Sequence, residues 1–374
     1  MSEYQYYEFQ TIDRPLDEKE RDEIASWSSR TVPTSTQAIF TYSYSDFPKS
    51  PKRVVEKYFD AMLYLSNWGS KRLMFRFPRS IIDAEIFRPY CFFDTVSTSV
   101  TEDLVILDMS FHDEEGGGYW IEGEGYLSSL IILRNDILNG DYRMLYLAWL
   151  NSINFEYDIE DYREELEPPV PDNLRNLSAP LQSFIDFFEI DKNLISAASE
   201  ASVNRTDSSV PAIKESVAKL TEAERIHFLV RFAKGEAHVN LQLQKRLREL
   251  SSEKARIGEP SQKRTVGALL RSAQEILKRK KEEERQKAER DRIRKLQKLE
   301  KQESELWERV SVLINTKKTK AYNEAVDILK DLCDLAKHLN QFDRFKSMIN
   351  KIHKDYSRLS GLKSRLNRAG LTMG

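Results

Sequence analysis

One imidazole and several carboxylates gather around a glycine run at 116–118. They are His112, Asp113, Glu114 and Glu115 before the glycines, and Glu122 and Glu124 after them. A hairpin at the glycines would bring these groups together, and an imidazole with carboxylates can hold a divalent metal or act as a general base. Surface loops ordinarily contain the same residue types, so a solvated acidic turn is the favoured interpretation.

The other histidines fall into two pairs. His227 and His238 stand eleven residues apart, which is about 16 Å by helical rise and too far to share a metal. His338 and His353 fall on two predicted helices that could approach each other, but no third ligand accompanies them. We therefore expect packing or surface roles for all four.

Neither the cysteines nor the glycines indicate a cofactor or a nucleophile. Cys91 lies in the apolar string PYCFF, where a small buried hydrophobe is the favoured role, and Cys333 is remote from it. Reduced thiols and a cytoplasmic location are expected. The glycines at 116–118 are followed by Tyr119 and Trp120 instead of a helix with a phosphate-binding lysine, so no nucleotide fold is implied.

The net charge of −2 conceals two halves of opposite sign. Residues 1–170 carry 31 acidic and 16 basic side chains, whereas residues 171–374 carry 29 acidic and 42 basic ones. Such asymmetry predicts either a basic arm that binds an anionic partner or a basic arm that folds onto its own acidic domain. The sequence leaves both alternatives open.

The basic excess is densest between residues 278 and 301, with 12 basic and 6 acidic side chains. The segment has no proline or glycine and predicts an exposed helix. Nucleic-acid phosphates bind such surfaces through counterion release, whereas interleaved carboxylates such as Glu282 and Glu289 favour a charged spacer helix. The candidate phosphate contacts are Lys278, Arg279, Lys280, Lys281, Arg290, Arg292, Arg294 and Lys295.

The N-terminal part alternates strand and helix patterns. Aromatic and β-branched residues at Tyr4–Phe9, 37–44 and 71–77 predict strands, as do the two runs FFDTVSTSVTED and LVILDMSF. Apolar spacing from Pro51 to Leu65 predicts a helix, residues 78–90 predict a short helix, and 127–153 predict helical cover for the sheet. The expected fold class is α+β, with a mostly antiparallel sheet packed by helices.

The rest of the chain is expected to be helical. Prolines and acidic residues at 160–177 predict a linker after an acidic α+β domain at 1–159. Beyond it we expect a helical segment at 178–262, in which Thr221 and Glu224 form a capping box and Gly235 separates two helices. A long charged helix at 263–316 and a helical hairpin at 317–374 should follow.

Two apolar patterns near the C-terminus suggest contacts between chains. Leucines and a valine between residues 296 and 313 follow heptad spacing, which predicts weak self-association. The two helices of the hairpin each carry an apolar stripe, whose exposed face would dock a protein partner. The candidate docking residues are Leu329, Leu332, Leu335, Phe345, Ile349 and Ile352.

At both ends the chain is similar to an uncharacterised bacterial family that opens with strings very like YQYYEFQ (4–10) and IDRPL (12–16). The stretches YFDAMLYLSNWGSKRLMFRFP and AYNEAVDILKDLCDLAKH also resemble that family, and the second resembles the C-terminal tails of bacterial SWIM zinc-finger proteins. That resemblance implies a shared docking helix pair. Because neither cysteine has a CxC or CxxC neighbour, no metal role carries over.

These observations rank three functions. The first is a non-enzymatic adaptor that binds protein partners through its N-terminal domain and its C-terminal hairpin. The alternative is a nucleic-acid-binding protein that uses the basic helix 263–301 and a basic tail containing Arg358, Lys363, Arg365 and Arg368. An enzyme with a metal at the 112–124 turn ranks last. No apolar run reaches the roughly 18 residues of a bilayer span, so no membrane contact is expected.

Overall fold

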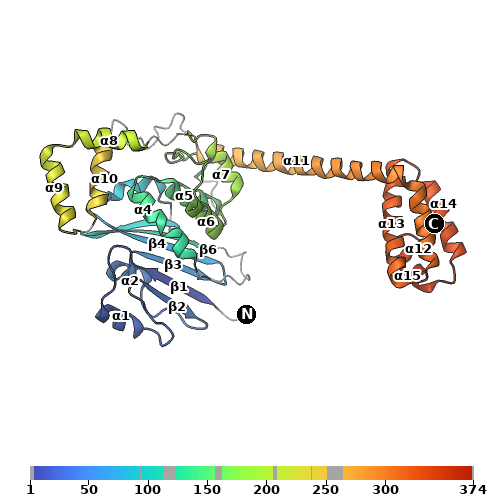
Figure 1. Cartoon of the computed structure of the whole chain (residues 1–374), viewed down its shortest axis with the longest axis horizontal. Helices are drawn as coiled ribbons and strands as arrows, with labels where there is room; N and C mark the ends of the chain where they lie inside the picture. Colours follow the sequence, from blue (N-terminus) through green and yellow to red (C-terminus); the bar gives the residue numbers. More distant parts are fainter. Residues whose placement is uncertain are drawn as a thin grey trace. The chain divides into compact units, whose positions relative to one another are not determined.

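The computed structural model describes residues 4–92, 94–112, 123, 125–155, 162–204, 209–236, 238–250 and 264–372 (Figure 1). It confirms an α+β fold, with an antiparallel sheet in the N-terminal part and helices in the C-terminal part. The chain divides into two compact units, Met1–Leu277 and Lys278–Gly374, here called the N-terminal and C-terminal units. The division falls within helix α11 (Val266–Lys301).

Within the described residues, six antiparallel strands form one sheet in the order β2-β1-β3-β4-β6-β5. Strand β1 lies between β2 and β3, and the first-strand prediction for the aromatic N-terminus is confirmed. The strands predicted at 37–44 and 71–77 and in the two later runs are confirmed as well. The bounds are β1 (Gln5–Gln10), β2 (Gln37–Tyr42), β3 (Ala61–Ser66), β4 (Ser70–Pro78), β5 (Val96–Val100) and β6 (Leu104–His112).

The single helix predicted from Pro51 to Leu65 is wrong in its second half. Helix α2 (Pro51–Lys57) is followed by strand β3, which begins at Ala61 between β1 and β4. Met62 and Leu63 point to opposite faces of the sheet and both are buried. A strand covered on both faces is apolar at successive positions, and a short apolar run has no period that distinguishes it from a helix.

The short helix predicted at 78–90 is also wrong. The segment contains two single-turn 3₁₀ helices, η1 (Ala84–Ile86) and η2 (Arg88–Tyr90). Their backbone bonds span three residues, as in the 2.9 Å bond from the Tyr90 N–H to the Phe87 carbonyl. Pro89 has no N–H to donate, so a longer α-helix has no continuous ladder through this position.

Successive side chains of the sheet enter two separate cores. On one face Tyr7, Phe9 and Met62 pack against α1 (Glu18–Ala25) and α2. On the other face Tyr6 and Leu63 pack against a helical layer, which confirms the cover predicted at 127–153. That layer consists of α3 (Tyr126–Leu130), α4 (Ile132–Leu138), α5 (Arg143–Phe155), α6 (Ala179–Phe188) and α7 (Lys192–Ser199).

The described part of the predicted linker, residues 162–177, packs on the helical layer's core. Leu174 is buried there, Val170 and Leu177 lie against it, and the Tyr90 hydroxyl donates to the Pro169 carbonyl at 3.1 Å. Prolines prevent regular hydrogen bonding but not packing. Instead of separating two units, this segment belongs to the N-terminal unit, and the division between units comes at 277.

The beginning of α11 is fixed to the N-terminal unit by a buried ion pair. Arg264 donates to both carboxylate oxygens of Glu167, at 2.5 and 2.7 Å, and the Tyr146 hydroxyl donates to the same carboxylate. Leu166 and Thr265 form a β-bridge beside it. Burial raises the pKa of Tyr146 well above its usual value, and the adjacent Glu167 adds to the shift, so the phenol remains a donor.

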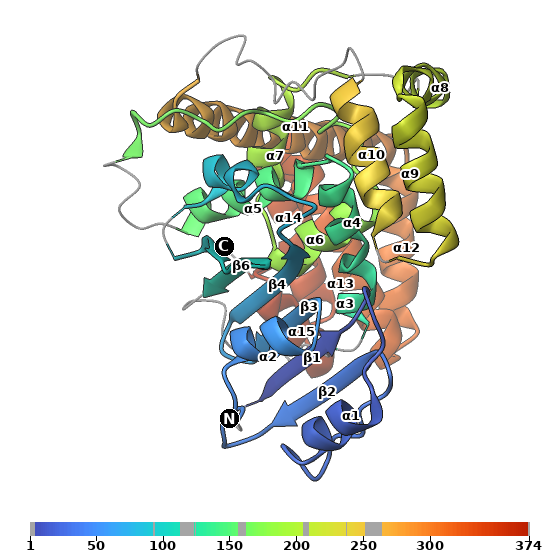
Figure 2. The same ribbon diagram turned by 90° about the vertical axis from the view of Figure 1, so that its left-hand side faces the viewer.

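Three helices, α8 (Ser209–Lys219), α9 (Glu222–Ala233) and α10 (Val239–Leu250), form a group within the N-terminal unit. Figure 1 and Figure 2 both show them as neighbours. The capping box of Thr221 and Glu224 is confirmed, with the Glu224 N–H donating to Thr221 Oγ1 at 3.2 Å. Gly235, with φ of 68°, follows the end of α9, where the left-handed conformation favours glycine.

The C-terminal unit is a bundle of short helices after α11. The long charged helix predicted at 263–316 is confirmed as α11, but it ends at Lys301, and α12 (Glu303–Asn315) begins after a break at Gln302. The hairpin is confirmed as α13 (Thr319–His338) and α14 (Phe342–Asp355). A further helix, α15 (Ser360–Arg368), was not predicted. The break lets the apolar residues on both sides of it enter one core.

Candidate interaction sites

The candidate docking residues of the hairpin lie in the core of the C-terminal unit. Helices α12 and α15 contribute Val310, Ile314, Leu362 and Leu366 to the same core. The expected exposed stripe is therefore wrong, since the apolar pattern of the hairpin belongs to the interior of a bundle. The buried residues are Leu329, Leu332, Leu335, Phe345 and Ile349, and Ile352 is half-buried against them.

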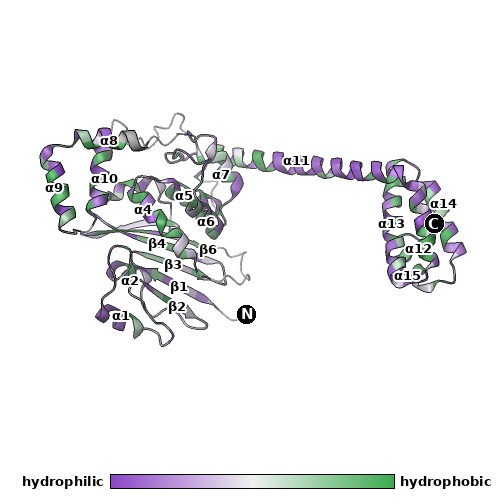
Figure 3. Cartoon of the chain, in the orientation of Figure 1, coloured by the Kyte–Doolittle hydropathy of each residue, from purple (hydrophilic) through white to green (hydrophobic). Residues whose placement is uncertain are grey.

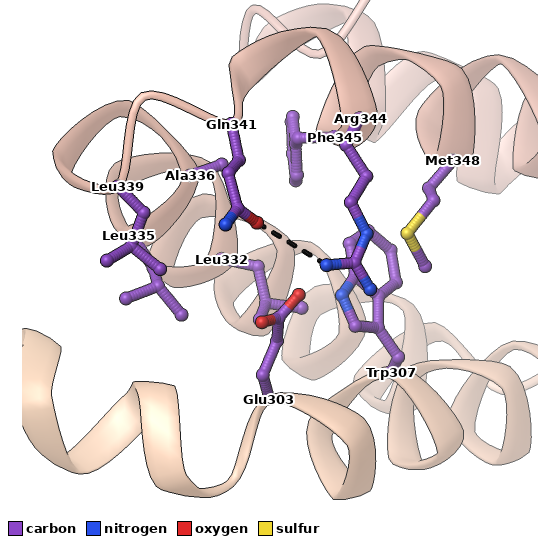
Figure 4. Close-up of a pocket in the computed structure, with 10 residues that line it drawn as sticks. All are labelled: Glu303, Trp307, Leu332, Leu335, Ala336, Leu339, Gln341, Arg344, Phe345 and Met348. Carbon is purple, nitrogen blue, oxygen red and sulfur yellow. Dashed lines mark hydrogen bonds between the residues drawn. The ribbon is translucent and has the colours of Figure 1, made fainter.

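A small crevice between α12, α13 and α14 exposes the edge of this core (Figure 4). Trp307 and Phe345 face each other there, with ring centroids 5.8 Å apart. At the rim Arg344 Nη1 donates to Gln341 Oε1 at 3.4 Å, beside the carboxylate of Glu303. The void measures about 10 Å³, which is room for one water-sized group and not for a partner's side chain.

The heptad residues at 296–313 are also used within the chain. Leu296 and Val310 are buried, and Leu299, Leu306 and Leu313 pack against the same core. The seam changes direction at Gln302 and contacts α13. The side chains expected to support self-association are therefore covered by the chain's own helices.

The predicted phosphate contacts do lie on an exposed helix. From Leu277 to Arg292 every side chain of α11 is exposed, and Figure 3 shows its ribbon change from green near the start to almost wholly purple. Several of the cations have a carboxylate partner, as in Arg292–Glu289 at 3.7 Å and Lys295–Asp331 at 2.6 Å. Lys278, Arg279, Lys281 and Arg290 have none among the described residues.

Basic charge continues beyond α11 in the C-terminal unit. Residues 278–374 carry 26 basic and 15 acidic side chains. Of the predicted basic tail, Arg358, Lys363 and Arg368 are exposed, whereas Arg365 is half-buried and donates to Asn323 Oδ1 at 2.6 Å. The unit as a whole therefore carries a net positive charge.

Sequence reasoning missed the most apolar exposed surface that the structure describes. Six of the fifteen exposed large apolar side chains lie on the adjacent helices α8 and α9, far more than their share of the chain. They are Ile213 and Val217 on α8, and Ile226, Leu229, Val230 and Phe232 on α9. Ile226, Leu229 and Val230, together with the exposed Ala233 on the same face, are called the α9 stripe below. Helical periodicity predicted this helix correctly, but periodicity does not show which of its faces is covered.

Helix α9 turns a mixed flank, which carries Glu224 and Phe228, toward α10. Glu224 and Phe228 are half-buried on the side of α10, where Arg246 donates to Glu224 Oε1 at 2.8 Å. Ile226, Leu229, Val230 and Ala233 recur at helical spacing on the opposite side, and no residue of α9 is buried. Leu229 is 67% exposed. The apolar side chains of α9 therefore gather on one exposed face of the helix.

A buried charge network joins the IDRPL segment to the sheet. Asp60 on the loop before β3 accepts from Arg76 Nη2 at 2.6 Å and from the backbone N–H groups of Ile12 and Asp13 at 2.6 and 2.8 Å. Burial alone raises the pKa of Asp60, but Arg76, Arg134 and the two N–H donors outweigh it and hold the pKa below its usual value.

The histidines and the cysteine that the sequence offered as reactive groups do not assemble into a site among the described residues. His112 Nδ1 lies 2.6 Å from Ser70 Oγ, while the rest of the acidic turn falls outside those residues. His353 is buried with Nε2 2.8 Å from the Leu371 carbonyl, and His338 is exposed. Burial raises the pKa of the Cys91 thiol, so this free cysteine is not activated. No group of three metal-ligating side chains occurs in this part of the chain.

Comparison with known proteins does not assign the chain to a family. No family model, no curated protein and no solved structure matches the chain. The resemblance to a bacterial family therefore stays a prediction.

Among the residues whose structure is described, no helix is both long and apolar enough for a bilayer span.

Proposed function

We propose that this protein is a non-enzymatic adaptor, located in the cytoplasm, whose N-terminal unit docks a protein partner on the α9 stripe. The observation that carries the proposal is the exposure of Ile226, Leu229 and Val230 on a helix whose opposite side already lies against α10. Exposed apolar residues cost solubility unless a partner covers them. The favoured partner presents an apolar face of a helix or strand, which fits a single helical stripe.

The proposal replaces the hairpin with α9 as the docking element. The hairpin residues contribute to stability in the C-terminal unit, and the crevice beside them is too small to admit a side chain. The mixed charges that flank the stripe, including Glu222, Arg225 and Lys234, favour a partner with polar residues at the rim of an apolar centre.

Photo-crosslinking in the native host tests which protein covers the stripe. A benzophenone side chain is placed at position 229, and in a matched protein at position 312, where Val312 is similarly exposed at 64% on α12. We expect one foreign protein to be crosslinked at 229 and not at 312, and the product to disappear when Ile226→Glu is added. A product containing a second copy of this chain, or equal products at both positions, would contradict the proposal.

A second candidate function is phosphate-backbone binding by α11. It is favoured by the exposure of Lys278, Arg279, Lys281 and Arg290 without carboxylate partners among the described residues. The i, i+3 ion pairs on the same helix, such as Arg285–Glu282 at 3.2 Å, support a charged spacer instead. The two functions differ in their response to salt.

Titration with duplex and single-stranded DNA at several salt concentrations measures that response. If α11 binds phosphates, the triple substitution Lys278→Gln, Lys281→Gln and Arg290→Gln reduces the slope of log affinity against log salt by up to about 3, since each phosphate contact contributes about 0.9. The control carries Lys49→Gln, Lys52→Gln and Arg53→Gln, three exposed cations in the N-terminal unit. Equal slopes for the two variants, or no salt-dependent binding, would exclude this function.

A further inference from the structure

A polar cavity of about 310 Å³ lies in the N-terminal unit between the IDRPL segment, α4 and the beginning of α10. Asp13 and Arg134 form its floor, and His238 stands at its side, with Nε2 3.7 Å from Asp13 Oδ2. His238 has φ of 62°, a conformation that is uncommon for a residue with a side chain. Residues more than 100 positions apart therefore meet in one concave site.

The floor of the cavity is rigid and electrically neutral. Arg134 donates two parallel bonds to Asp13, at 3.0 and 2.6 Å, and a third to the Arg76 carbonyl at 2.7 Å. The Arg134 side chain is only 1% exposed, and Asp60 with Arg76 forms a second pair behind it. Each carboxylate has its own guanidinium, so the floor offers no spare charge to a charged ligand.

Four carboxamide side chains line the cavity without a hydrogen bond to another described side chain. Asn135, Asn139, Asn240 and Gln244 line the cavity, are exposed, and have no side-chain hydrogen-bond partner among the described residues. Each carboxamide supplies both donors and an acceptor. Several such groups converging on one cavity favour a ligand whose own groups donate and accept at once.

We propose that this cavity binds a neutral, hydroxyl-rich small molecule through adjacent hydroxyl groups on a ring. A charged ligand would lose hydration without gaining a free counter-charge. The lining residues include no phenylalanine, tyrosine or tryptophan on which a large aromatic ligand would stack. Adjacent hydroxyls, which both donate and accept, match the carboxamides and the Asp13 carboxylate. They occur in free sugars and in the ribose of nucleosides.

Ligand-observed NMR with the full chain tests this site and separates the two sources. The probes are D-glucose, D-ribose, adenosine and 2′,3′-dideoxyadenosine, which lacks the two adjacent hydroxyls of the ribose ring. We expect saturable binding of at least one hydroxyl-bearing probe and none of the dideoxy analogue. Binding of the free sugars identifies a sugar site, whereas binding of adenosine alone identifies the ribose of a nucleoside.

Paired variants locate the binding. The double substitution Asn139→Ala with Gln244→Ala is expected to raise the dissociation constant at least about tenfold, because two hydrogen bonds to the ligand are lost. The control, Gln297→Ala with Asn367→Ala, removes two exposed carboxamides from the C-terminal unit and should leave the constant unchanged. No saturable binding by any probe, equal binding of the dideoxy analogue, or equal effects of the two double variants would overturn the proposal.

Discussion

The substitution Asp60→Asn is expected to lower the free energy of unfolding by about 3–5 kcal/mol. The Asp60 side chain is fully buried, and its carboxylate faces Arg76 and Arg134. The carboxylate also accepts hydrogen bonds from the backbone N–H groups of Ile12 and Asp13. The amide keeps the shape but leaves two buried guanidinium groups with one carboxylate fewer. Urea unfolding followed by circular dichroism measures the change.

The pH dependence of stability gives a second readout for the same residue. The folded-state pKa of Asp60 lies below its usual value near 3.9. Its contribution is therefore complete above about pH 4 and is lost as the pH falls through the folded pKa. The difference between wild type and Asp60→Asn should shrink below about pH 4. The control Asp103→Asn, at an exposed turn, should change little, and a loss under 1 kcal/mol for Asp60→Asn would contradict the network's role.

Phe345→Ala is expected to destabilise the C-terminal unit by about 3–5 kcal/mol. Its ring is buried against Trp307 and the core leucines, so truncation leaves a cavity. Hydrogen exchange read by mass spectrometry localises the change to residues 303–372. The matched control is Phe342→Ala, a half-buried ring at the edge of the same helix, which should cost less. An unchanged exchange pattern together with a lost protein partner would restore the docking role predicted for the hairpin.

Much of the fold could be predicted because its patterns are local. The strand alternation of β1 and β4, the capping box at Thr221 and the hairpin of α13 and α14 each depend on neighbouring residues. Strand β3 could not be distinguished from a helix because both of its faces are covered, so its apolar residues have no period. The break at Gln302 depends on a core formed with α13, which lies later in the chain.

The candidate sites depend on contacts that no local pattern contains. An apolar helix face looks the same in sequence whether the bundle covers it, as for Leu329 on α13, or leaves it exposed, as for Leu229 on α9. The cavity joins Asp13 to Arg134, which are 121 positions apart, and to His238. The sequence does draw attention to Asp13, which belongs to the IDRPL string. The residues next to Asp13 in the sequence do not identify Arg134 as its partner.

Docking of a protein on the α9 stripe is tested most directly by the affinity of the crosslinked partner for variants of the stripe. Calorimetric titration compares the wild-type chain with Leu229→Glu and with Val312→Glu. Both positions are about two-thirds exposed, so neither change should alter stability by more than about 0.5 kcal/mol. We predict that Leu229→Glu weakens binding at least about thirtyfold and that Val312→Glu leaves it unchanged. Equal affinities for all three proteins would contradict the account.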